Sequence, residues 1–202
     1  MLALLLALTA PQGGSLTIGF GAAGSVKIDG LTPWYDERVY HDPPLMSPRG
    51  DAAALRFCHD FAKYQPCTVY LAQPGQPVQT LKNSNVQRLL WTGDGQYLIG
   101  AGANTVRLWN LSAGGRAAVP YPVLTGKQRS VSQIERLWFR DRDLCVAMSS
   151  EVFGPNGGYA TGRLTTTTRY ALPTLQPLTV TTLEGSKKEA ECRPSTSSAL
   201  WP

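Results

Sequence analysis

The sequence predicts an all-β chain built from repeated four-stranded antiparallel units, and three observations lead to this prediction. First, 20 glycines and 15 prolines are spread along all 202 residues, which is typical of many short strands joined by turns. Second, the segment "LLWTGDGQYLIGAGANTVRLWNL" at 89–111 alternates apolar runs with glycine and asparagine turns. Third, parts of that pattern return at a spacing of about 40 to 45 residues, the length of one four-stranded unit.

Three segments share an apolar start, a turn and a second apolar run. They are "MSPRGDAA" from Met46, "WTGDGQYL" from Trp91 and "WFRDRDLC" from Trp138. A later strand also recurs, at 68–71, 105–108 and, more loosely, 169–172. After each comes a break and a short outer strand, which we expect at "PVQTL" (77–81), "YPVLTG" (121–126) and "PLTVTTL" (177–183). The sequence therefore predicts three units with the same strand order.

The two ends of the chain differ from these units. "SLTIGFGAAGSVKI" predicts two short strands around a glycine-rich turn, and "DERVYHD" predicts the innermost strand of the first unit. The run "MLALLLALTA" has the length of a signal-peptide core and is too short to span a bilayer, which takes about 20 residues. We expect residues 1–14 to be a signal peptide, although a buried first strand is the alternative. Residues 15–183 then form the β-domain, and the polar stretch 184–202 is expected to be a disordered tail.

The segment 89–111 resembles one blade of a β-propeller of the WD-repeat type. It runs strand, Gly-Asp-Gly turn, strand, Asn104 turn and a third strand that closes on Trp109-Asn110, where the family closes on Trp-Asp. The resemblance extends over about residues 36–183 and implies a β-propeller-like fold of three to four four-stranded antiparallel blades. The Gly-His pair that opens WD repeats is missing from all three units, so a more general propeller repeat fits equally well. Propellers usually close with four to eight blades, so three units favour an incomplete ring or open arc, with a small four-blade ring as the alternative.

The four cysteines bear on the cellular compartment. Cys58 and Cys67 flank "HDFAKYQP", between the strand-like runs "AALRF" and "TVYLA". If these runs pair as a hairpin, the two cysteines come within disulfide reach. Cys145 and Cys192 could also pair, but a free buried thiol at Cys145 is equally consistent with the sequence. A disulfide and a signal-peptide core together favour a secreted, periplasmic or cell-envelope protein.

The charged residues give little support to catalysis or nucleic-acid binding. The net charge of +5 is modest, and Arg136, Arg140 and Arg142 alternate with carboxylates that should cancel them: Glu135, Asp141 and Asp143. Two His-Asp pairs, His41-Asp42 and His59-Asp60, have the chemistry of metal ligands or acid–base groups. No third ligand of matching type is apparent, so we expect no catalytic residue, metal or cofactor. No nucleophile elbow, zinc-type cysteine pair or nucleotide fingerprint is present in the sequence.

The leading hypothesis is an exported, non-enzymatic β-propeller-like module that binds a protein partner through loops held on a rigid scaffold. One expected loop runs from His59 to Gln65 and includes Asp60 and Tyr64. The other runs from Gly154 to Tyr159 and includes Pro155 and Asn156, where Asn156-Gly157 is a strong hairpin-turn signal. The rival is a cell-envelope enzyme or small-ligand or metal-binding protein using His41, Asp42, His59 and Asp60. Self-association through exposed strand edges is a third expectation.

Overall fold

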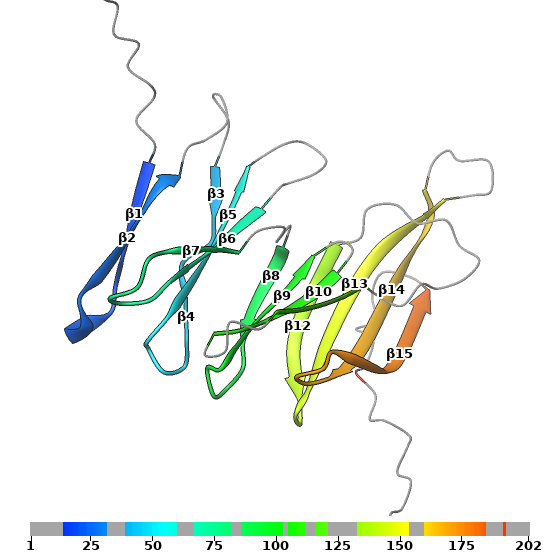
Figure 1. The fold of residues 1–202 in the computed structure, drawn as a ribbon. Coiled ribbons are helices and arrows are strands. Elements are labelled where there is room, and N and C mark those ends of the chain that lie inside the picture. The colour runs from blue at the N-terminus through cyan, green and yellow to red at the C-terminus, as the bar shows by residue number, and fades with distance from the viewer. Residues whose placement is uncertain are drawn as a thin grey trace, which may run out of the picture. The chain divides into compact units, whose positions relative to one another are not determined.

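The computed structural model describes residues 14–31, 39–59, 67–81, 86–102, 105–111, 116–120, 133–153, 160–184 and 192. These residues form fifteen strands in four separate antiparallel sheets, and their one helical element is the 3-10 turn η1 (Gly21–Ala23) (Figure 1). The prediction of an all-β chain is confirmed. None of the described residues belongs to a helix long and apolar enough to cross a membrane. The chain divides into two compact units, residues 1–83 and 84–202.

Unit 1 contains a two-stranded sheet and a larger sheet. The first is the hairpin of β1 (Gly14–Gly19) and β2 (Ser25–Leu31). The second has the order β3-β5-β6-β7, with β4 also paired to β5. Its strands are β3 (Val39–His41), β4 (Leu45–Met46), β5 (Ala53–His59), β6 (Cys67–Ala72) and β7 (Gln79–Leu81). The hairpin and the larger sheet bury one core, made of Ile18, Phe20, Ile28, Leu31, Ala53, Leu55, Phe57 and Ala72.

Unit 2 contains two four-stranded sheets in which the strands follow one another in chain order. The first consists of β8 (Val86–Trp91), β9 (Tyr97–Gly102), β10 (Thr105–Asn110) and β11 (Arg116–Pro120). The second consists of β12 (Gln133–Arg140), β13 (Asp143–Phe153), β14 (Ala160–Ala171) and β15 (Gln176–Glu184). The two sheets share a core of Ile99, Ala101, Val106, Leu108, Ile134, Leu144, Val146, Met148, Tyr170 and Leu175.

The strand β13 is buried on both of its faces. Because side chains alternate along a strand, Leu144, Val146 and Met148 point into the shared core. Cys145 and Ser149 lie on the opposite face and are nevertheless almost fully buried. That opposite face of the second sheet carries small and polar side chains, and it positions most of the polar contacts described below.

One glycine of the first sheet is required by close packing. A Cβ added at Gly100 of β9 would lie 2.7 Å from the indole of Trp109 and 2.8 Å from the Val86 side chain. Trp109 is the tryptophan that the sequence places at the end of the best-matched segment, and it is buried. The flat indole therefore fills the space above Gly100.

The three matched sequence segments all lie at the turn between consecutive strands that pair with each other. They span the β4–β5, β8–β9 and β12–β13 turns. The expected outer strands at 77–81 and 177–183 correspond to β7 and β15. The expected strand at 121–126 lies outside the described residues. The fourth strand of that sheet is β11, which pairs with β10 from Arg116 to Pro120, ahead of the expected segment.

Candidate binding site

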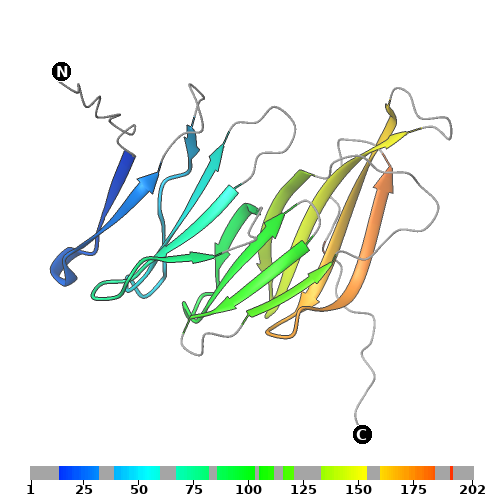
Figure 2. The ribbon, with the colours of Figure 1, turned by 45° about the horizontal axis from the view of Figure 1, so that its top comes forward.

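The hairpin of β13 and β14 extends beyond the strands on either side of it. These strands have 11 and 12 residues and are the longest in the described part of the chain. The pairing of β12 with β13 ends at Gln133 and Ser149, and that of β15 with β14 ends at Glu184 and Leu164. Residues 151–153 and 160–163 therefore pair with each other past both ends, and we call them the hairpin arm. Figure 2 shows the arm rising above the sheet.

Three polar side chains connect the root of the hairpin arm to the neighbouring strand. The Ser149 hydroxyl and the Arg163 guanidinium both donate to the Glu135 carboxylate of β12. Arg163 also donates to the Ser149 hydroxyl oxygen over 2.6 Å. Glu135 lies at the register shift between Ile134 and Arg136, and such a bulge redirects a side chain. The contacts fix the arm to the sheet at its base.

The first predicted loop, from His59 to Gln65, begins at a disulfide in unit 1. Cys58 of β5 stands directly opposite Cys67 of β6, and their sulfur atoms are 2.11 Å apart. Arg56 lies beside this bond: its Nε donates to Asp42 over 2.7 Å, and its NH1 group lies 3.8 Å from the Cys67 sulfur. The β5–β6 hairpin is thus closed by a covalent bond where the loop leaves the sheet, and the ion pair links β5 to the residue that follows β3.

Most of the predicted binding residues lie outside the described residues. They are Asp60 and Tyr64 in the first loop, and Pro155, Asn156 and Tyr159 in the second. His59 is the last residue of β5 and stands opposite Val39. What the structure places is therefore the root of each loop, not its tip. Of the expected signal peptide, residues 1–14, all but Gly14 also lie outside, as does the tail after Glu184 except for Cys192.

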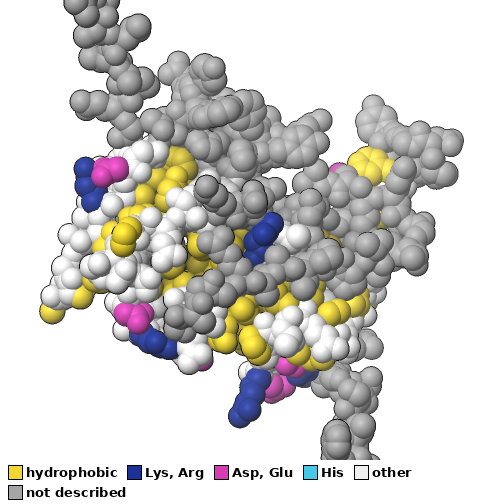
Figure 3. All heavy atoms as spheres, in the orientation of Figure 1, with side chains coloured by type: hydrophobic (Ala, Val, Ile, Leu, Met, Phe, Trp, Pro, Cys, Tyr) yellow, Lys and Arg dark blue, Asp and Glu magenta, His cyan; other side chains and the backbone are white. Residues whose placement is uncertain are grey.

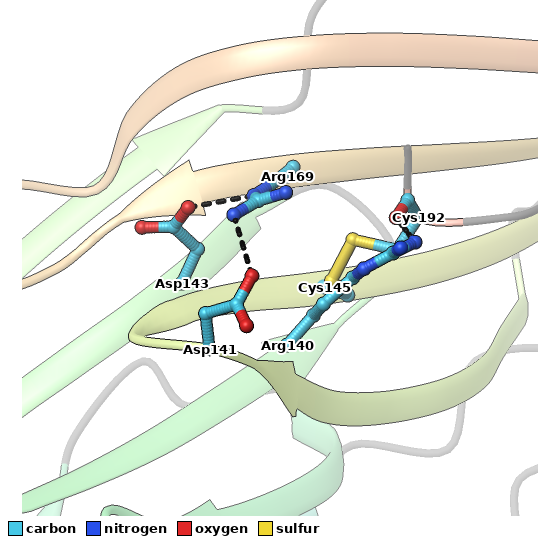
Figure 4. Close-up of polar contacts among 6 residues, drawn as sticks. All are labelled: Arg140, Asp141, Asp143, Cys145, Arg169 and Cys192. Atoms are coloured by element: carbon cyan, nitrogen blue, oxygen red, sulfur yellow. Dashed lines mark hydrogen bonds and ion pairs between the residues drawn. A yellow bond between two sulfur atoms is a disulfide. The ribbon is translucent and has the colours of Figure 1, made fainter. Parts of the chain in front are cut away.

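Arg169 forms the most buried ionic cluster that the structure describes. Its side chain is only 7% exposed, and its Nε donates to Asp143 over 2.6 Å while NH2 lies 3.4 Å from Asp141 (Figure 4). Asp141 adopts a left-handed backbone conformation, with φ 58°, in the tight turn before β13, which aspartate tolerates better than most residues. The turn thus directs two carboxylates toward one buried guanidinium.

A second disulfide lies next to this cluster. Cys145 stands opposite Arg169 in the β13–β14 ladder and is bonded to Cys192, 47 residues later in the sequence. Arg140 donates to the main-chain carbonyl of Cys192 (Figure 4). Of the two alternatives that the sequence left open for Cys145, the structure has the disulfide. Cys192, within the expected tail, is buried against the sheet.

The two histidines occupy adjacent strands. His41 stands opposite Phe57, and His59 stands opposite Val39, two residue pairs away. Asp42 forms the ion pair with Arg56, and Asp60 lies outside the described residues. Among the residues that the structure places, no group of three His, Cys, Asp or Glu residues could hold a metal ion.

The charges of the β12–β13 segment are balanced by different partners from those expected. Glu135 pairs with Arg163, and Asp141 and Asp143 pair with Arg169. The two arginines on β12 make other contacts: Arg140 with the Cys192 carbonyl, and Arg136 over the Trp138 ring at 5.0 Å. On the face drawn in Figure 3, the visible lysine and arginine side chains stand apart from one another, several beside a carboxylate. This distribution differs from the continuous basic surface typical of nucleic-acid binding.

Sequence reasoning did not find Arg163 and Arg169. Both lie in "GRLTTTTRYAL", where β-branched residues indicate a strand but not its partner. Only the pairing of β12, β13 and β14 brings Arg163 to Glu135. The same pairing brings Arg169 to Asp141 and Asp143. The available signal was the even spacing of Arg163 and Arg169, because residues an even number apart on one strand lie on the same face of the sheet.

Comparisons with known proteins leave the family open. No protein-family model matches the chain, and no curated protein sequence matches it. One solved structure that resembles it is the acylaminoacyl peptidase of Pyrococcus horikoshii, with a TM-score of 0.49 and 11% sequence identity. The alignment covers 73% of this chain and 25% of that chain, so this chain spans about a quarter of the peptidase. A likeness at this level carries no argument about fold or activity.

Proposed function

We propose that this protein is an exported, non-enzymatic, β-propeller-like module that binds a protein partner through the loop at the tip of the hairpin arm. The blade-like arrangement is supported by the sheet order. In three of the four sheets, a path of four antiparallel strands follows the chain from one edge to the other. This is the order within a propeller blade of the WD-repeat type that the sequence resembles.

A recurring turn supports the same architecture. In unit 1, Ser47 N–H donates to the Ala52 carbonyl over 2.8 Å, and Gly50 N–H returns to the Ser47 carbonyl over 2.9 Å. In unit 2, Thr92 N–H donates to the Tyr97 carbonyl over 3.0 Å, and Gly95 N–H returns to the Thr92 carbonyl over 2.8 Å. In both turns a hydroxyl accepts from the N–H five residues later. The same six-residue turn thus leads into β5 in unit 1 and into β9 in unit 2.

The observation that carries the binding proposal is the extension of the hairpin arm beyond β12 and β15. A loop at the end of such an arm reaches a partner before the body of the sheet does. The contacts among Glu135, Ser149 and Arg163 hold the arm at its root. Because a fixed arm loses little conformational freedom on association, this arrangement suits recognition.

Export is supported by the two disulfides, Cys58–Cys67 and Cys145–Cys192. Disulfides persist in oxidising compartments and are rare in the reducing cytosol. All four cysteines of the sequence are used. This usage fits a secreted, periplasmic or cell-envelope location.

Site-specific photo-crosslinking tests the proposal. A photoreactive side chain would be placed at Asn156 or Tyr159 in the expected loop, and at Thr174 as the control. Thr174 is exposed and lies in the turn at the opposite end of β14. In cells that make the protein naturally, we expect one adduct of defined mass from positions 156 and 159 and none from 174. Adducts of equal yield from 174, or none from the loop, would contradict binding through the arm.

Arg163→Ala provides a second test of the same idea. It removes the guanidinium that links the arm root to Glu135 without changing the loop itself. We expect a lower crosslinking yield at position 156, with the circular dichroism spectrum unchanged. An unchanged yield would show that the root contacts do not position the loop.

A further inference from the structure

The strand β15 presents the longest sheet edge in the described part of the chain. It has nine residues and is the last strand of its sheet, and no described strand pairs with its outer side. In an antiparallel ladder, alternate residues direct their N–H and C=O groups away from the neighbouring strand. An edge of this length can therefore accept a further strand.

The composition of β15 offers little protection against such pairing. Natural edge strands are commonly short, carry lysine or inward-pointing charges, or are interrupted by bulges. From Pro177 to Leu183 the strand has no charged residue. Leu178 and Val180 are large apolar side chains that remain 37% and 39% exposed. Pro177 and the one register shift, which falls between Pro177 and Thr179, both lie at the beginning of β15, so the ladder from Thr179 to Glu184 is regular.

The other described edges differ in these respects. β3 and β7 have three residues each, β4 has two and β11 has five. β1, β2 and β8 have six or seven residues and present no exposed large hydrophobic side chain. β12 has eight residues but carries Glu135, Arg136 and Arg140. Short length and charge are the usual devices that limit edge pairing. Among the described edges, β15 alone combines a length of nine residues, an uncharged stretch from Pro177 to Leu183 and exposed apolar side chains.

We propose that β15 pairs antiparallel with β15 of a second copy of this chain, across a two-fold axis near the middle of the strand. The inference is independent of the hairpin arm and does not rest on the proposed function. An antiparallel pair of identical strands is self-complementary and closed, so association stops at a dimer.

The distribution of charge along β15 suits a second copy as the occupant, because identical strands meet there without charge repulsion. With the axis at residue 180 or 181, Glu184 of one copy faces residue 176 or 178 of the other, both of which are uncharged. No like charges meet. The exposed residues Val180 and Thr182 face each other or neighbouring uncharged residues, and β-branched and threonine pairs stabilise antiparallel strands. Pairing also covers the exposed side chains of Leu178 and Val180.

A charge-exchange experiment tests the proposal. One variant carries Val180→Lys and Thr182→Lys, and a second carries Val180→Glu and Thr182→Glu. Both side chains are exposed, and for each of the two axis positions a substituted residue opposes a substituted residue of the same charge. The control is Leu45→Lys with Met46→Lys on β4, where the side chains are 36% and 39% exposed. Light scattering after size exclusion reports mass against 21.9 kDa for one chain.

We expect the wild type and the control to be dimers at high micromolar concentration. Each charged β15 variant should dimerise at least about fivefold more weakly, because opposed like charges destabilise a strand pair. An equimolar mixture of the lysine and glutamate variants should recover the dimer, because the lysine side chain introduced at position 180 then faces an introduced glutamate for either axis position. This recovery distinguishes strand pairing from a general loss of stability.

Several results would overturn the proposal. They are a monomeric wild type, a dimeric lysine variant, or a mixture that stays monomeric although both variants are folded by circular dichroism. If the variants fail to fold, amide hydrogen exchange on the wild type gives the answer. Amides of residues 178–183 should exchange more slowly as the protein concentration rises, and concentration-independent exchange would reject the dimer. Crosslinking at the hairpin arm is a separate readout, so either proposal can fail while the other stands.

Discussion

The Arg56 site of unit 1 and the Arg169 site of unit 2 both place an arginine–aspartate ion pair beside a disulfide. In unit 1 the arginine side chain is 13% exposed and its partner Asp42 is 55% exposed. In unit 2 the arginine is 7% exposed and its partner Asp143 is 20% exposed. The cysteines are nine residues apart in unit 1 and 47 apart in unit 2.

The difference in burial and in loop length indicates which of the two sites contributes more to the free energy of unfolding. A disulfide acts chiefly by limiting the unfolded chain, and it does so more strongly for a longer loop. An ion pair matters more when losing one partner leaves the other buried without compensation. Both effects point to unit 2 as the more dependent on its crosslinked site.

The largest expected effect comes from removing the disulfides. Cys145→Ala with Cys192→Ala should lower the free energy of unfolding of unit 2 by about 4 kcal/mol, and Cys58→Ala with Cys67→Ala should lower that of unit 1 by about 2.6 kcal/mol, from the two loop lengths. Denaturant unfolding followed by hydrogen exchange in each unit measures both. Peptide mapping without reductant should first show two linked peptide pairs; freely alkylated thiols in protein from an oxidising compartment would contradict the pairing and the argument for export.

The next effect concerns the ion pairs. Arg169→Ala leaves Asp143 partly buried without its partner, so we expect a loss of about 3 kcal/mol. Arg56→Ala should cost about 1 kcal/mol, because Asp42 can be solvated once its partner is gone. Urea midpoints of the two variants provide the comparison. Equal losses would mean that the depth of burial does not separate the two sites.

A third prediction uses the buried tyrosine of unit 2. Burial raises the pKa of Tyr170 to about 12, whereas a tyrosine in an unfolded chain ionises near pH 10. The folded state holds the neutral phenol, so its stabilising effect is complete below about pH 10 and is lost as the pH rises toward 12. Unit 2 should lose about 2 to 3 kcal/mol over this interval, measured by urea unfolding at each pH. Tyr170→Phe should remove that pH dependence, and a variant that kept it would assign the effect to another group.

The smallest predicted effect is one that the two units should share. Gly50 and Gly95 occupy the same position of the recurring turn, with φ values of 72° and 65°. Other residues adopt this left-handed conformation at a cost of about 1 to 2 kcal/mol. Gly50→Ala and Gly95→Ala should therefore lower the thermal midpoint of their own units by similar amounts. A large inequality would show that the two turns are alike only in backbone geometry.

Strand order and turns could be predicted from the sequence because they depend on local signals. Glycine in the β4–β5 and β8–β9 turns and apolar runs on either side marked these segments in advance. The strand β11, at Arg116–Pro120, was not predicted, because the apolar run "AAVPYPVL" (117–124) does not show which of its residues pair with β10. The partner strand decides which residues pair.

The polar sites were harder to predict, since they depend on register. Cys58 and Cys67 were found because a short hairpin brings them together by local geometry alone. Cys192 reaches Cys145 from 47 residues away, and Arg163 and Arg169 meet their carboxylates only after β12, β13 and β14 have aligned. The spacing of residues along the sequence does not predict such contacts between strands that are far apart in the chain.

The bond between Cys145 and Cys192 also changes what a break in the main chain does to the molecule. Residues 145 to 192 form a covalent ring that includes the hairpin arm and β15. A single cleavage anywhere in that ring, including the expected loop at 154–159, leaves two polypeptides joined through sulfur. The nicked molecule keeps the mass of the intact one, apart from one added water, until a reductant is supplied. It then separates into two fragments on a denaturing gel, so a gel resolves the fragments of a nicked chain only under reducing conditions.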